Sequence, residues 1–220
     1  MKVNTDGILL GAWADCSEAS TILDIGCGNG LIALMIAQRF ENASIWGVEI
    51  DEGAFLDSVD NCRNSPFADR MEINHDSIQL YSRFSKLSFD HILSNPPFFT
   101  GGTFTSNENK ANVRHTIKLS HGDLLQSVKR LLSPEGKFSI ILPYIEGLRF
   151  QELAQRSGLT SCRITHVYSK KDKPVHRLLL TFSNRKKDNI AAQDQIVIHD
   201  SDSSYSQDYI NLTKGFYLAH

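Results

Sequence analysis

Short β-type runs alternate with helix-type runs through the first two thirds of this sequence, and that alternation limits the fold more than any other feature. The clearest strand-type runs are TILDIG, ASIWGVE, MEINHD, FDHILSN and GKFSIILP. The runs between them, such as GLIALMIAQRF, carry apolar residues at helical spacing. This alternation is typical of a parallel sheet covered by helices on both faces, so we predict an α/β fold.

The remainder of the chain extends the same pattern. RFQELAQRSG is predicted to be a helix, LTSCRITHVYS and VHRLLLTFS to be strands, and IVIHD to be a short extra strand. The polar stretch NRKKDNIAAQDQ between them is predicted to be a solvated loop. A chain of 220 residues has room for one α/β domain with a full core but not for two, so residues 1–220 are expected to form a single domain.

Composition excludes several classes of protein. No apolar stretch approaches the roughly 18 residues of a membrane span, and no secretory segment is visible at the start, so a cytoplasmic location is expected. The four cysteines lack CxxC spacing, which favours free thiols over a zinc site or disulfides, and no metal is expected. A net charge of −2 argues against a globally basic nucleic-acid coat, although basic residues can still gather locally.

The run LDIGCGNG is the first chemical signal, because it joins a strand to a helix through Gly26, Gly28 and Gly30. These glycines permit a tight turn and close approach of a ligand to the backbone. Glu49 follows at the end of the next strand, where a carboxylate can accept both hydroxyl hydrogens of a ribose. Leu31 stands where a dinucleotide fingerprint has its third glycine, so NAD is disfavoured. An ordinary glycine-rich turn remains the alternative interpretation.

With Asp76 after the third strand and NPPF after the fourth, these motifs resemble, in order, those of class I S-adenosylmethionine-dependent methyltransferases. The resemblance runs from residue 5 to about residue 145 and implies a Rossmann-like, doubly wound, mostly parallel seven-stranded sheet with S-adenosyl-L-methionine as cofactor. By this resemblance Asp24 and the three glycines lie against the methionine part of the cofactor, Glu49 holds the ribose, and Asp76 and Ser77 lie near the adenine. The full set of implied cofactor contacts is Thr5, Asp6, Asp24, Gly26, Gly28, Gly30, Glu49, Asp76, Ser77 and Asn95. The residues HDS could equally be a helix N-cap.

The NPPF motif, Asn95, Pro96, Pro97 and Phe98, is suited to methylation of an exocyclic amine on a nucleobase. The lone pair of such an amine is delocalised into the ring, and two acceptors aimed at its N–H groups can restore its nucleophilicity. Asn95 and the Pro96 carbonyl can supply those acceptors, the prolines hold the carbonyl and add no donor, and Phe98 can stack on the base. A turn of this composition without catalysis is the alternative.

A narrower resemblance spans almost the whole chain. TDGILLGAWAD, SNPPFF, ANVRHT, VHRLLLTFS and YSQDYINLTKGFYLAH resemble a bacterial family that methylates N6 of an adenine in tRNA, adenine 37 in the anticodon loop of tRNA1(Val). Members usually carry an upstream segment of aromatic and basic residues, which we expect this chain to lack, and commonly have Tyr in place of Phe98. Guanine N2-methylation of ribosomal RNA and a non-catalytic nucleotide-binding adaptor are the alternatives.

The RNA contacts are predicted at the ligand end of the fold. Residues 99–118 form a long connection of the kind that often carries function, and we expect it to be a substrate loop. Lys110, Arg114 and Lys118 within it are candidates for phosphate contact, and Arg177 with residues 170–173 is a second basic patch that could contact RNA. The aromatic residues of the tail recur at near-helical spacing, which favours packing of a C-terminal helix. The chain is expected to act as a monomer.

Overall fold

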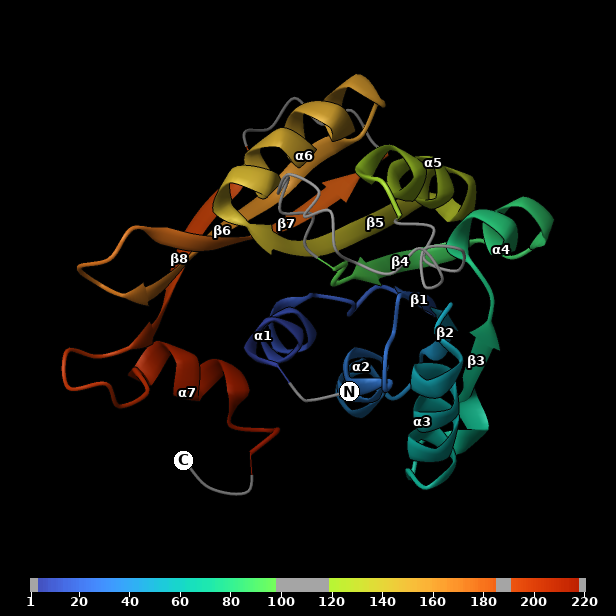
Figure 1. Cartoon of the computed structure of the whole chain (residues 1–220), viewed down its shortest axis with the longest axis horizontal. Helices are drawn as coiled ribbons and strands as arrows, with labels where there is room; N and C mark the ends of the chain where they lie inside the picture. The colour runs from blue at the N-terminus through green and yellow to red at the C-terminus, as the bar shows by residue number, and fades with distance from the viewer. Residues whose placement is uncertain (1–3, 98–118, 185–190, 218–220) are drawn as a thin grey trace, which may run out of the picture.

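The computed structural model describes residues 4–97, 119–184 and 191–217, and these residues form one eight-stranded sheet with helices on both faces (Figure 1). The helices are α1 (Thr5–Trp13), α2 (Leu31–Arg39), α3 (Glu52–Arg63), α4 (Ile78–Phe84), α5 (His121–Leu131), α6 (Tyr144–Arg156) and α7 (Gln207–Thr213), with a short 3-10 turn, η1 (Ala68–Arg70). The strands are β1 (Thr21–Ile25), β2 (Ser44–Glu49), β3 (Met71–His75), β4 (Phe89–Ser94), β5 (Leu132–Pro143), β6 (Thr160–Lys170), β7 (Val175–Ser183) and β8 (Ala192–His199).

The strand order is β3-β2-β1-β4-β5-β7-β6-β8, and all neighbouring strands are parallel except that β7 runs antiparallel to β5 and β6. The prediction of a mostly parallel, doubly wound sheet is therefore confirmed. Chain order reverses between β1 and β4, which is the point at which ligands bind in open α/β sheets.

The predicted count of seven strands is wrong, because β8 adds an eighth along β6. It begins at Ala192, inside the stretch predicted to be a solvated loop. Residues 192–195 are exposed, and only Ile196 and Ile198 point into the core. The second half of β8 confirms the predicted short strand IVIHD. An edge strand pairs on one side only, so residues 192–195 can be polar without loss, and periodicity alone does not reveal them.

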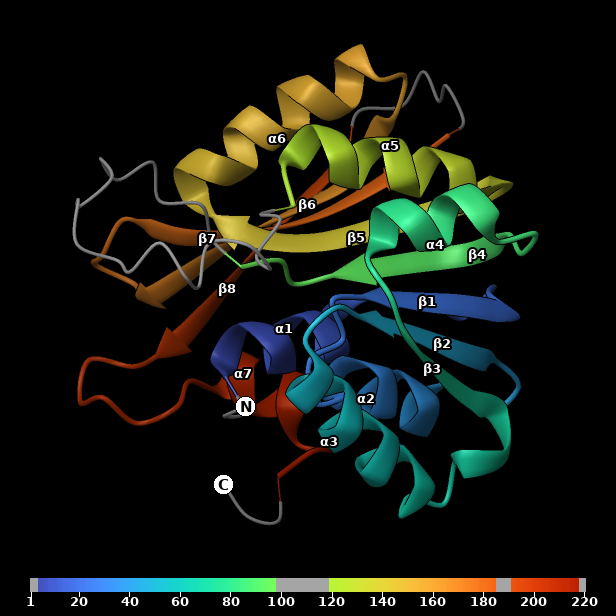
Figure 2. The ribbon, with the colours of Figure 1, turned by 45° about the vertical axis from the view of Figure 1, so that its right-hand side comes forward.

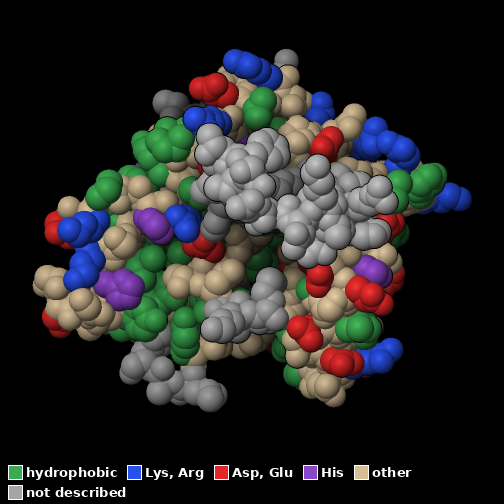
Figure 3. All heavy atoms as spheres, viewed as in Figure 1, with side chains coloured by type: hydrophobic (Ala, Val, Ile, Leu, Met, Phe, Trp, Pro, Cys, Tyr) green, Lys and Arg blue, Asp and Glu red, His purple; other side chains and the backbone are tan. Residues whose placement is uncertain are grey.

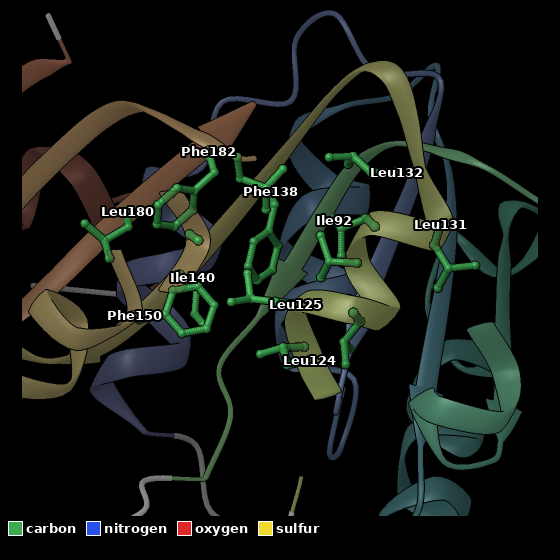
Figure 4. Close-up of a cluster of buried hydrophobic side chains, with 14 of the residues drawn as sticks. Ile92, Leu124, Leu125, Leu131, Leu132, Phe138, Ile140, Phe150, Leu180 and Phe182 are labelled. Carbon is green, nitrogen blue, oxygen red and sulfur yellow. The ribbon is translucent and has the colours of Figure 1, made fainter. Parts of the chain in front are cut away.

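Two layers of helices bury the two faces of the sheet. Helices α4, α5 and α6 cover one face, and α1, α2, α3 and α7 cover the other (Figures 1 and 2). On the first face Phe138, Phe150 and Phe182 pack together with ring centroids 5.8 to 6.2 Å apart (Figure 4). Such aromatic clusters bury large apolar areas and fix the helices against the sheet. Within the described ranges, no helix has the length and apolar character needed to cross a bilayer.

Helix α1 was not predicted as a helix, because residues 7–13 are all buried and the segment therefore shows no polar face. Its last residue is fixed to β6, far along the chain. The Trp13 indole Nε1 donates to Thr165 Oγ1 at 2.8 Å, and the Arg163 guanidinium lies over the Trp13 ring at 4.5 Å. Arg163 also pairs with Asp194 of β8 at 2.7 Å.

Candidate active site

The predicted motifs come together at the carboxyl edge of the four strands β3, β2, β1 and β4. The register aligns Ile25 at the end of β1 with Val48 and Ser94 on its two neighbours. The Ser94 hydroxyl donates to the Ile25 carbonyl at 3.0 Å, which ties the ends of β1 and β4 together. Residues that follow these strand ends therefore share one surface, as expected of a ligand site in this type of sheet.

The glycine turn after β1 depends on left-handed backbone conformations. Gly26, Gly28 and Gly30 have φ values of 69°, 59° and 82°, which glycine adopts without steric penalty. The N–H groups of Gly26 and Cys27 donate to the Val48 carbonyl of β2. A Cβ added to Gly26 would meet nothing within 4 Å. The turn therefore requires glycine at these positions for its backbone conformation, and open space lies beside Gly26.

The Glu49 carboxylate locks this turn to the end of β2. It is 8% exposed, and its Oε2 accepts from the Gly28 N–H at 2.8 Å. Its Oε1 accepts from the N–H groups of Ile50 and Asp51, each at 2.8 Å. A carboxylate has about four lone-pair positions, so one remains for a ligand hydroxyl. Glu49 accordingly shapes the turn and keeps one acceptor position for a ligand hydroxyl.

Asp24 near the end of β1 is a buried acid that makes no hydrogen bond with the part of the chain that the structure describes. It is 1% exposed, and neither carboxyl oxygen has a hydrogen-bond partner among the described residues. Burial raises its pKa to about 7 and the Glu49 charge adds to the rise; the Ala33 backbone amide offsets part of it without reaching hydrogen-bonding geometry. Unpaired buried carboxyls are rare in folded proteins, and this one is suited to a cationic ligand group.

Asp76 and Ser77 occupy the next strand end. Ser77 is the N-cap of α4, because its hydroxyl accepts from the Leu80 N–H at 3.3 Å, so the N-cap alternative holds for Ser77. Asp76 Oδ1 accepts from the Ser77 N–H at 2.7 Å, and the Asp76 N–H donates to the Glu49 carbonyl at 3.0 Å. The pair therefore borders the Glu49 end of β2.

Asn95, Pro96 and Pro97 follow β4 directly. Asn95 is half-buried, Pro96 is buried and Pro97 is exposed. The first turn of α1 lies beside them: a Cβ built on Gly7 would lie 3.8 Å from Asn95 Nδ2 and 3.3 Å from Leu31 Cδ2. Phe98 lies outside the described residues, as do Lys110, Arg114, Lys118 and the whole predicted substrate loop.

The start of α1 lies beside the site, but the periodicity of the sequence did not predict a helix there. Asn4 caps the helix by accepting from the Gly7 N–H at 2.7 Å, and an Asn immediately before a helical run is the signal that could have shown it. Thr5 is exposed in the first turn. Asp6 pairs with Arg177 of β7, with 3.0 Å between Oδ2 and Nε. The structure therefore joins one predicted cofactor residue to one predicted RNA residue.

A separate cavity of about 540 Å³ lies at the opposite edge of the sheet, lined by residues such as Asp15, Asp90 and Lys137. None of the predicted site residues that the structure describes lines it. The buried His91 ring is hydrogen-bonded to Ser139 there at 2.9 Å, and burial lowers its pKa to about 3, so it is neutral. Among the described residues no cluster of His, Cys, Asp or Glu could hold a metal ion.

Comparison with known proteins agrees with this arrangement. A model of the methyltransferase small domain matches residues 7–143. The tRNA1(Val) (adenine(37)-N6)-methyltransferase of Haemophilus influenzae is 42% identical over 219 residues, covering 99% of this chain and 92% of that protein. The Vibrio cholerae protein of the same name is 42% identical over 218 residues, covering 99% and 89%. A crystal structure described as a predicted O-methyltransferase from Agrobacterium tumefaciens matches with a TM-score of 0.73, covering 98% of each chain at 19% identity, which shows the fold.

Proposed function

This chain belongs to the family of bacterial tRNA1(Val) (adenine(37)-N6)-methyltransferases, and from that membership we propose that it transfers a methyl group from S-adenosyl-L-methionine to N6 of adenine 37 in that tRNA, in the cytoplasm. The observation that carries the proposal is the position of Asn95 and Pro96. They follow β4 directly, next to the end of β1, where the buried Asp24 and the glycine turn lie.

The described residues fit S-adenosyl-L-methionine. This cofactor carries an ammonium and a sulfonium, and Asp24 offers a buried carboxyl that has no other partner among the described residues. The open side of Gly26 leaves room for the methionine part. Glu49 would accept from a ribose hydroxyl, and Asp76 with Ser77 would lie near the adenine. When bound, the cofactor supplies a methyl group activated by the positive charge on sulfur.

Asn95 and Pro96 would orient and activate the substrate amine. Asn95 Nδ2 is on the side of α1, which leaves Oδ1 to accept one N–H of the target amine, and the Pro96 carbonyl would accept the other. Phe98 is proposed to stack on the flipped base. The N6 nitrogen held by these acceptors would take the methyl group from the bound cofactor, with S-adenosylhomocysteine as the leaving group, and would then lose its extra proton to water. Positioning supplies most of the rate, so no strong general base is needed.

Charge on the site face favours approach of RNA away from α3, for example from the side of β6 and β7. In Figure 3 acidic side chains gather at the lower right, over α3, whereas Lys, Arg and His side chains lie on the left, over the β6–β7 end, and further Lys and Arg side chains lie at the upper right, over α4 and α5. Asp51, Glu52 and Asp57 are exposed at α3, and Lys171 and Lys173 are exposed after β6. A polyanion is drawn to the second group and repelled by the first. Lys110, Arg114 and Lys118 are proposed as further phosphate contacts.

Nucleoside mass spectrometry tests the proposed reaction. The purified chain is incubated with S-adenosyl-L-methionine and either tRNA that lacks the modification or unmodified ribosomal RNA. N6-methyladenosine is expected in the tRNA only. N2-methylguanosine in the ribosomal RNA would instead assign the chain to guanine methylation, and cofactor binding without a methylated product from either RNA would favour a non-catalytic adaptor.

Replacing Glu49 with alanine is expected to weaken cofactor binding about tenfold to hundredfold, because it removes a charged acceptor from the ribose and the acceptor for three backbone N–H groups. Isothermal titration calorimetry with S-adenosylhomocysteine measures the dissociation constant. Glu52→Ala removes the same charge from the exposed start of α3 and is the matched control. An unchanged dissociation constant for Glu49→Ala would refute the ribose role.

A further inference from the structure

We propose that Asp6 and Arg177 form a positioning pair, which holds the first turn of α1 against Asn95 and so sets the orientation of the amide that receives the substrate amine. This inference rests on the proposed function for its catalytic consequence. It assigns to both residues a role other than cofactor or RNA contact.

The ion pair is well suited to fixing a position. Arg177 Nε lies 3.0 Å from Asp6 Oδ2, and the two side chains are only 16% and 14% exposed. Partly buried pairs are less screened by water and salt than surface pairs. The Lys137–Glu18 pair at the opposite edge has the same 3.0 Å separation, but its side chains are 35% and 82% exposed, so little stabilisation is expected from it.

Both partners stand on elements that border the site. Arg177 is aligned with Pro143, the last residue of β5, so it lies at the carboxyl edge of the sheet. Its Nη1 also donates to the His176 carbonyl at 3.1 Å, which restricts the guanidinium. Asp6 belongs to the first turn of α1, which Asn4 caps. The pair therefore ties the start of α1 to the sheet edge beside β4 and β5.

A displacement of that turn would reach the reacting groups directly. Gly7 follows Asp6, and an added Cβ there would come within 3.8 Å of Asn95 Nδ2 and 3.3 Å of Leu31 at the start of α2. The α1 backbone thus packs between the amine acceptor and the helix that follows the glycine turn. Misplacement of a catalytic group by about 1 Å can lower the rate about a hundredfold.

The variant Asp6→Asn distinguishes the positioning role of the pair from RNA contact by Arg177 and from cofactor contact by Asp6. If Arg177 served RNA phosphates, Asp6→Asn would free a cation and strengthen tRNA binding, while Arg177→Gln would weaken it and reduce its salt dependence. If Asp6 served the cofactor, only its own variant would raise the cofactor dissociation constant. A positioning pair instead predicts that both single variants lower kcat alike and that the double variant is no worse than either.

The experiment compares Asp6→Asn, Arg177→Gln and the double variant with Lys137→Gln and Glu18→Gln as controls. Steady-state kinetics on unmodified tRNA should show kcat reduced about tenfold to a hundredfold in all three, with KM for tRNA and the cofactor dissociation constant within about twofold. The controls should match the unmodified chain. Tighter tRNA binding by Asp6→Asn, additive losses, or unchanged kcat would each overturn the proposal.

A second readout does not depend on catalysis. The side-chain amide signal of Asn95 in a ¹H–¹⁵N spectrum, assigned by its loss in Asn95→Asp, should move in Asp6→Asn and in Arg177→Gln but not in the controls. If the chain without substitutions methylates no RNA, the proposed function is refuted. The movement of the Asn95 amide signal still tests the positioning pair in that case. An unmoved Asn95 signal in both variants overturns the positioning role.

Discussion

Replacing Asn95 with alanine is expected to lower kcat for tRNA methylation by about a thousandfold, because the variant loses one of the two acceptors that restore nucleophilicity to the amine. Loss of one preorganised hydrogen-bonding group at a reacting centre typically lowers kcat by about 10²- to 10³-fold. The cofactor dissociation constant should change by less than about twofold, since Asp24 and Glu49 are untouched. Single-turnover kinetics with saturating cofactor measure the chemical step directly.

Asn211→Ala is the matched control for this variant, because Asn211 is exposed on α7 and lies on no element of the site. It should leave both constants unchanged. Unaltered turnover in Asn95→Ala would remove Asn95 from the mechanism, and a large rise in the cofactor dissociation constant would move its role from the amine to the cofactor.

Asp24→Asn is expected to stabilise the ligand-free protein at pH 8 and to weaken cofactor binding. The pKa of Asp24 is raised from its ordinary 3.8 to about 7, so the folded state binds the proton more tightly than the unfolded state. The stability that this proton provides is complete below pH 4 and is lost as the pH rises through 7. The free-energy difference is on the order of 4 kcal/mol when fully developed. Urea unfolding at pH 5 and pH 8 should show the advantage of the variant growing with pH.

Asp24→Asn should also lower cofactor affinity about tenfold to a hundredfold. In the chain without substitutions, cofactor affinity should rise between pH 6 and pH 8, because the ionised carboxyl is the form that binds a cation, and the variant should lack this rise. Calorimetry in buffers of different ionisation enthalpy would show proton release on binding to the unmodified chain only. Asp69→Asn, at an exposed position of η1, is the control. Equal pH dependence in Asp24→Asn and the unmodified chain would contradict this account.

The sequence predicts the central strands and the glycine turn because their signals are local. An apolar β-branched run, a glycine and a helical period can each be read within about ten residues. Helix α1 and the first half of strand β8 escape such patterns for opposite reasons, since α1 is buried on nearly all sides and residues 192–195 of β8 are mostly polar and exposed.

In the candidate site, too, the residues in local motifs were predicted, but the contacts between distant segments were not. Asp24, Glu49, Asp76 and Asn95 were predicted at strand ends, and the parallel register brings those ends together. No local pattern shows that Asp24 lacks a partner in the described structure or that Asp6 meets Arg177, because both depend on contacts between distant segments. The roles of Phe98 and of residues 99–118 stay predictions.

The attachment of α1 at both ends has a consequence for synthesis of the chain on the ribosome. Trp13 is held by Thr165, 152 positions later, and Asp6 by Arg177, 171 positions later. Helix α1 is therefore synthesised early but can make these two contacts only after β6 and β7 have left the exit tunnel. Although the matched methyltransferase domain ends at residue 143, a nascent chain of that length has no anchor for α1 on β6 or β7.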